Sequence, residues 1–88
     1  MKIVIGPPAR AVMGWNIDVS VQADSGEKIA QVEIRVNDFP EVRDTLDDPE
    51  DSWEQTLMQK GVFPGDNKIV VVVNNDAGKE TRAERKWQ

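Results

Sequence analysis

The longest apolar run of the chain lies near its C-terminal end. Residues 69–73 are one isoleucine and four valines, and a cluster of turn-forming residues follows at 74–78. A polar segment at 79–86 then alternates with period two. A β-branched run, a turn and a second run of period two predict a β-hairpin. Gly78 suits the left-handed position of a type I turn followed by a bulge, and a Pro64-Gly65 turn leads into the hairpin.

Two segments upstream alternate in the same way. Residues 15–23 place apolar side chains at the odd positions and polar ones between them, which is typical of a strand with one buried face and one wet face. Residues 29–37 alternate again, with valine or isoleucine at the even positions from 32 to 36. Turn residues at 24–26 and 37–40 end these strands. The upstream half therefore predicts further strands that pair with the hairpin or cover it.

The first strand is interrupted by prolines. Residues 2–5 are a short strand candidate, and Gly6-Pro7-Pro8 breaks it, because prolines belong at sheet edges. Residues 9–13 resume as a second edge segment. We expect the chain to switch from one sheet to the other at this break.

The middle of the chain is ambiguous. Residues 41–43 are a candidate short strand, and the five acidic side chains of 44–52 indicate a loop or a helix start. A capping aspartate, a proline at the first helical position and acids in the first turn favour a short helix at 49–60. As a strand, residues 52–59 show poor apolar alternation, but the short spacing of the surrounding elements favours a strand of a second sheet. We expect the strand, with the helix as the alternative.

Composition narrows the classes of function. The chain has 88 residues, the length of one domain with a modest core, and its net charge of −5 argues against binding to nucleic acid or an anionic membrane. It has no cysteine and no histidine, which removes thiolate metal sites, disulfides and the usual general base. No apolar run approaches the roughly 18–20 residues that cross a membrane. We therefore expect no cofactor, no bound metal, no membrane insertion and no enzymatic activity.

Four stretches of the chain combine turn and core residues in a recurrent pattern. They are an alternating strand that ends in Asn (29–37), an aromatic residue that opens a strand (53–57), a Pro-Gly turn before an aliphatic strand (64–73), and an Asp-Ala-Gly turn (75–79). Together these stretches resemble the bacterial immunoglobulin-like domains of multidomain surface and secreted proteins. Lys79 stands where this family usually has Asn, and the acidic segment 44–52 is longer than is typical. These motifs are turn and core residues, so they specify a fold rather than an activity.

The resemblance implies an all-β, immunoglobulin-like sandwich of about seven antiparallel strands, similar to fibronectin type III domains. It implies a non-catalytic spacer or an adhesion or assembly module, whose partners are neighbouring domains of its parent or another protein. It also implies an extracytoplasmic location, at the cell surface, in the periplasm or secreted. We expect residues 1–88 to be one domain excised from a longer protein, without a signal peptide of its own, and monomeric when isolated.

Five residues are candidates for an interaction surface. Val70 and Val72 are expected on the outer face of the hairpin sheet, beside Glu33 and Arg35. Adjacent outward valines mark a contact surface, or simply reflect the preference of β-branched residues for strands. Trp87 is either an exposed aromatic contact or a lid over the open end of the core, whereas the other two tryptophans are expected to pack inside.

Two further features leave alternatives open. The acidic residues 44–51 and Trp87 suggest a carbohydrate- or calcium-assisted ligand-binding module as the alternative function, since Ca²⁺ binds carboxylate oxygens. The segment lacks the spacing of a recognised calcium loop, and a solvated acidic loop is the simpler interpretation. On the last strand, Arg85 shares the parity of the core positions, so the strand twists outward there or the side chain extends toward solvent.

Overall fold

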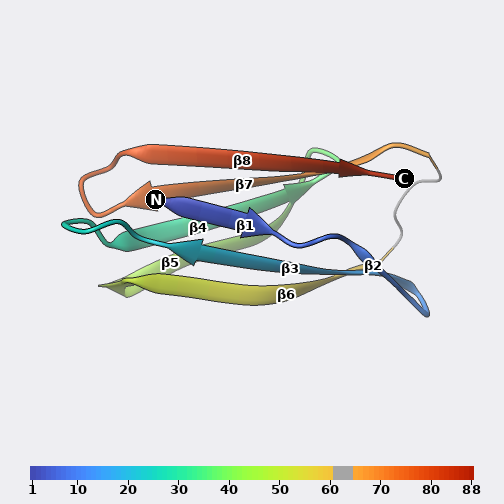
Figure 1. The fold of residues 1–88 in the computed structure, drawn as a ribbon, viewed down its shortest axis with the longest axis horizontal. Coiled ribbons are helices and arrows are strands. Elements are labelled where there is room, and N and C mark those ends of the chain that lie inside the picture. Colours follow the sequence, from blue (N-terminus) through green and yellow to red (C-terminus); the bar gives the residue numbers. More distant parts are fainter. Residues whose placement is uncertain (61–64) are drawn as a thin grey trace.

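In a computed structural model the chain folds into a two-layered β-sandwich (Figure 1). The structure describes residues 1–60 and 65–88, and these residues contain strands but no helix, hence none that could span a membrane. The predicted all-β class is confirmed. The described strands are β1 (Lys2–Ile5), β2 (Ala9–Ala11), β3 (Gly14–Gln22), β4 (Ile29–Val36), β5 (Phe39–Glu50), β6 (Ser52–Lys60), β7 (Asn67–Asn75) and β8 (Glu80–Trp87).

The strands pair antiparallel in two sheets. In one sheet β3 is central, with β6 on one side and with β1 and β2 end to end on the other. The other sheet has the order β5-β4-β7-β8. Because β1 and β2 both pair with β3, the expected switch between sheets at Gly6-Pro7-Pro8 is wrong. The amide of Gly6 donates a 2.7 Å hydrogen bond to the carbonyl of Asp18, which holds the chain against β3 across the break.

The core lies between the two sheets and is built from the alternating positions. The side chains buried there include those whose parity predicts an inner face: Ile17, Val19 and Val21 from β3, Val32, Ile34 and Val36 from β4, Trp53 and Leu57 from β6, and Ile69, Val71 and Val73 from β7. The body measures 41 × 19 × 19 Å. The two termini lie toward opposite ends of the long axis (Figure 1).

The acidic middle segment is strand rather than loop. β5 continues to Glu50, but the pairing with β4 jumps from Thr45 opposite Gln31 to Glu50 opposite Ile29. Residues 46–49 therefore have no partner on β4 and form a bulge. Pro49 fits there, because it has no N–H to give to the ladder. The expected loop or helix start at 44–52 is wrong.

Strand β6 also replaces the helix considered for 49–60, so the strand expectation is confirmed and the helix alternative is wrong. Nine consecutive residues of β6 pair with β3, from Ser52 opposite Gln22 to Lys60 opposite Gly14. Long-range pairing of this length outweighs the local capping signals, which stabilise a helix by about 1 kcal/mol each.

Two hairpin turns position the neighbouring strands. Val36 pairs with Phe39, and the two residues between them, Asn37 and Asp38, have φ of 50° and 70°. A two-residue loop with both φ values positive is a type I′ turn. The observed turn is therefore two residues shorter than the turn expected over 37–40.

The second hairpin, β7–β8, closes as the sequence predicts. Gly78 has φ of 83°, its amide donates to the carbonyl of Asn75 at 3.0 Å, and the amide of Asn75 donates to the carbonyl of Lys79 at 2.9 Å. This is a type I turn followed by a glycine bulge. The turn expected at Pro64-Gly65 lies partly outside the described residues.

Candidate interaction surfaces

The outer face of the β5-β4-β7-β8 sheet brings four of the five candidate residues together. Val72 pairs directly with Glu33, and Val70 pairs directly with Arg35. Directly paired residues share one face of a sheet. Since the alternate positions of β7 are buried in the core, this face points away from it.

Charged side chains dominate this outer face. Glu33 lies between two arginines, with Arg35 Nε at 2.8 Å and Arg43 Nη2 at 3.7 Å from its carboxylate oxygens. Val72 is only 8% exposed and lies outside the core cluster, between the long side chains of Glu33 on β4 and Arg82 on β8, whereas Val70 is half-buried. The expected patch of two exposed valines is therefore reduced to Val70 within a grid of ion pairs.

Trp87 lies apart from that face. It pairs with Asn67 at an inner-face position, and its ring meets that of Trp15 edge to face, with centroids 6.0 Å apart and an interplanar angle of 74°. The guanidinium of Arg10 lies 5.3 Å from the centroid of the Trp15 ring. Both tryptophans pack against the core. The structure thus places Trp87 as a lid over the end of the core.

An open hollow of about 510 Å³ lies beside Trp87 and is lined mainly by polar side chains. The amide groups in it already have partners: Asn37 Nδ2 donates to Asn67 Oδ1 at 2.9 Å, and Asn37 Oδ1 accepts from the amide of Lys68 at 2.9 Å. The Nε1 of Trp87 is buried and has no hydrogen-bond partner among the described residues.

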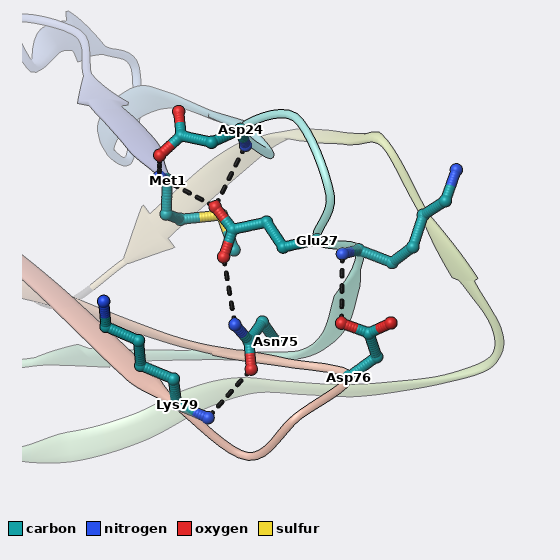
Figure 2. Close-up of polar contacts among 7 residues, drawn as sticks. Met1, Asp24, Glu27, Asn75, Asp76 and Lys79 are labelled. Carbon is teal, nitrogen blue, oxygen red and sulfur yellow. Dashed lines mark hydrogen bonds and ion pairs between the residues drawn. The ribbon is translucent and has the colours of Figure 1, made fainter.

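A polar network at the other end ties the chain start to two turns (Figure 2). The Met1 ammonium forms ion pairs with Asp24 and with Glu27, the latter at 3.0 Å. Glu27 also accepts a 3.0 Å hydrogen bond from Asn75 Nδ2 and another of 3.0 Å from the amide of Asp24. These donors, led by Asn75, lower the pKa of Glu27 from 4.5 to about 2. The same ion pairs, led by Asp24, raise the pKa of the Met1 ammonium above 8.0.

Asn75 is the centre of this network and is buried. Besides donating to Glu27, it accepts hydrogen bonds at its Oδ1 from the amides of Ala77 at 2.9 Å and Lys79 at 2.8 Å. The sequence marks Asn75 as a turn residue but gives no sign of Glu27 as its partner, because 48 residues separate them. This pairing appears only once the β3–β4 and β7–β8 turns lie at the same end of the sandwich.

The acidic residues of 44–51 are dispersed. Asp44 accepts a 2.8 Å hydrogen bond from Trp53 Nε1, whereas Asp51 pairs with Lys28 Nζ at 2.6 Å and thereby raises the pKa of that lysine. Within residues 1–60 and 65–88, no three His, Cys, Asp or Glu side chains form a group that could hold a metal ion.

Arg85 joins the two sheets along one side of the sandwich. It occupies an inner-face position of β8, opposite Ile69, but its guanidinium Nη1 reaches the backbone carbonyl of Ile5 in β1 at 2.9 Å. The alternatives for Arg85 were a strand that twists outward and a side chain that extends toward solvent. The side chain does extend, but its guanidinium ends on the edge of the opposite sheet.

Scans against protein-family models, curated proteins and solved structures each find no match to this chain. Function is therefore inferred from the geometry of the fold and from the resemblance of the sequence motifs.

Proposed function

We propose that this domain is a non-catalytic module that spaces or joins the neighbouring parts of a larger bacterial protein. The observation that carries the proposal is the course of the chain. It begins toward one end of a body 41 Å long and finishes toward the other (Figure 1). A sandwich that the chain crosses in this way separates the two neighbouring parts of the protein by about its own length.

Contacts along both sides of the sandwich support a rigid spacer. On one side, Arg85 connects β8 to the carbonyl of Ile5 in β1. On the other side, Trp53 Nε1 connects β6 to the carboxylate of Asp44 in β5. Each contact crosses between sheets, so sliding of one sheet over the other breaks hydrogen bonds as well as core packing.

The contact surface of the module is the outer face with Val70, Glu33 and Arg35, beneath which Val72 is buried. A grid of exposed ion pairs around one half-buried valine suits a polar contact with a neighbouring domain, which is the usual character of interfaces between domains of one chain. Trp87 takes no part in this surface, because it packs on Trp15.

Antibodies raised against the purified domain test the proposal in the source cells. Reactive protein much larger than residues 1–88, found in the periplasmic, surface or secreted fraction, supports a module of an extracytoplasmic protein. Reactive protein of the size of residues 1–88 in the cytosol would overturn both the spacer role and the location.

A carbohydrate-binding module is the second candidate, and the hollow beside Trp87 is the observation that favours it. Titration with soluble oligosaccharides, followed by the indole N–H signals in NMR spectra, checks it. Shifts of the Trp87 signal and of the Asn37 amide support this candidate. For the calcium-assisted form, millimolar Ca²⁺ must also raise Tm, because a ligand that binds the folded state stabilises it.

A further inference from the structure

The sandwich has four sheet edges, and the chain protects the two edges formed by β1/β2 and β5. An unprotected edge offers unpaired N–H and C=O groups to another strand, and prolines, bulges, charges or covering segments prevent this. Pro7-Pro8 divides β1 from β2. Strand β5 contains Pro40 and Pro49 and is interrupted by the bulge at 46–49.

The edge formed by β8 is protected by charged side chains and by a strand of the opposite sheet that covers it. Its outward side chains alternate in sign along the strand, and β1 of the opposite sheet lies against it. The hydrogen bond from Arg85 to Ile5 holds these two strands together.

Among the described residues, strand β6 has no proline, no bulge and no covering strand, and only two charges. It pairs with β3 over nine residues, and its two charged side chains are Glu54 and Lys60. It lies along the lower margin of the molecule in Figure 1. Its contacts with β5 run through side chains, as in the bond from Trp53 to Asp44, and its pairing among the described strands is with β3 alone.

The charge pattern of β6 is complementary to itself. In an antiparallel pair of β6 strands centred on Leu57, each Glu54 lies opposite Lys60 of the other copy, because the two positions are equally far from the centre. The remaining opposed positions join Gln55 with Gln59 and Thr56 with Met58, so no like charges meet. A two-fold axis through Leu57 makes every contact twice.

The two charges are also available for such a pair. Within the molecule Glu54 lies opposite Ser20, and Lys60 lies opposite Gly14, neither of which is charged. Met58, on the same outer face, is 72% exposed, and a second β6 strand would cover part of it. We propose that β6 is a strand-addition edge through which two copies of this chain pair antiparallel about Leu57, so that one sheet continues across both molecules.

This pairing is a property of the domain alone and holds whether or not the domain spaces its neighbours. It places the long axes of the two copies in opposite directions. An interface of one strand from each copy is small and therefore weak. The domain is then monomeric when dilute, as the sequence suggests, and pairs at roughly millimolar concentration.

Sedimentation and NMR spectra of the whole chain, from about 10 μM to about 1 mM, test the pairing. The expected result is a concentration-dependent dimer with amide shifts concentrated in β6. Glu54→Lys and Lys60→Glu should each raise the dissociation constant about tenfold, because two cross-strand ion pairs become two repulsive pairs. The double variant Glu54→Lys/Lys60→Glu should restore the dissociation constant to within about twofold of the native value. Glu84→Lys, on the outer face of β8, is the matched control and should leave it unchanged.

Three results overturn the proposal. One is a monomer at the highest concentration, with every variant folded by circular dichroism. Another is a dimer whose dissociation constant the single charge reversals do not change or the double reversal does not restore. The third is a dimer whose shifts lie on the outer face around Val70 instead of on β6.

Discussion

The side-chain amide of Asn75 donates a 3.0 Å hydrogen bond to the carboxylate of Glu27, 48 residues away in the chain. With the Met1 ammonium and the amide of Asp24, it surrounds this carboxylate with donors (Figure 2). The network joins the start of the chain, the β3–β4 turn and the β7–β8 turn. Because these donors favour the ionised carboxylate, the stability of the fold should depend on the protonation of Glu27.

The first prediction concerns acid. The pKa of Glu27 is about 2 in the folded chain, below its ordinary value of 4.5, so its contribution is fully present above pH 4.5 and is lost as the pH falls toward 2. At neutral pH, Glu27→Gln should lower the free energy of unfolding measured with urea, and the difference from the native chain should shrink below pH 4.5. A difference that does not change with pH would show that the charge of Glu27 is not what stabilises the network.

The second prediction concerns the free Met1 ammonium of the isolated domain. The pKa of the Met1 ammonium is raised above 8.0, so its stabilising contribution is present below pH 8.0 and is lost as the pH rises through the folded value. Acetylation of Met1 should therefore lower Tm at neutral pH and have little effect at strongly alkaline pH. In a chain that carries Asp24→Asn and Glu27→Gln, acetylation should have little effect on Tm at any pH. An equal decrease in Tm on acetylation of the native chain and of this variant would contradict the prediction.

The inner faces of the strands were predictable because their alternation is local. In residues 15–23 and 29–37, every second side chain is apolar, and these side chains fill the core. Strand β6 was harder to predict from the sequence, because Trp53 and Leu57 are four residues apart, a spacing that also fits one face of a helix. What decides in favour of a strand is the row of partners on β3, which lie 30 to 46 residues earlier in the chain, and no local pattern reveals them.

The surface features depend on neighbours that the sequence does not bring together. The outward direction of Val72 follows from period two, but its burial depends on charged side chains from adjacent strands. The capping signals before Pro49 had a clear local meaning, yet the same residues also suit a bulge, where a missing N–H costs nothing. The partner of Glu27 depends on which turns share one end of the fold.

The third prediction separates the two valines of the outer face. Val72 is 8% exposed, so Val72→Ala should cost about 1.5 kcal/mol of unfolding free energy through lost burial of two methyl groups. Val70 is half-buried, and Val70→Ala should cost about half as much. Urea denaturation of both variants measures the difference. Equal and small losses would show that both side chains are exposed and that the surrounding charged groups do not cover Val72.

The last prediction concerns Gly14, which lies where β2, β3 and β6 meet, opposite Ala11 and Lys60. A Cβ atom at Gly14 would lie 1.9 Å from the carbonyl oxygen of Gln59, so alanine must push β6 away from β3. Gly14→Ala should therefore cost about 3 kcal/mol and lower Tm sharply, as overpacking against backbone does.

Gly26→Ala is the control for this substitution. Gly26 has φ of 88° with nothing within 4 Å of its Cβ position, so alanine there should cost the left-handed conformation alone, about 1 kcal/mol. Gly14 has φ of 157°, so its loss should combine backbone strain with the approach of Gln59 and should exceed the loss at Gly26. Equal losses would mean that backbone conformation, rather than the closeness of β6, requires glycine at the start of β3.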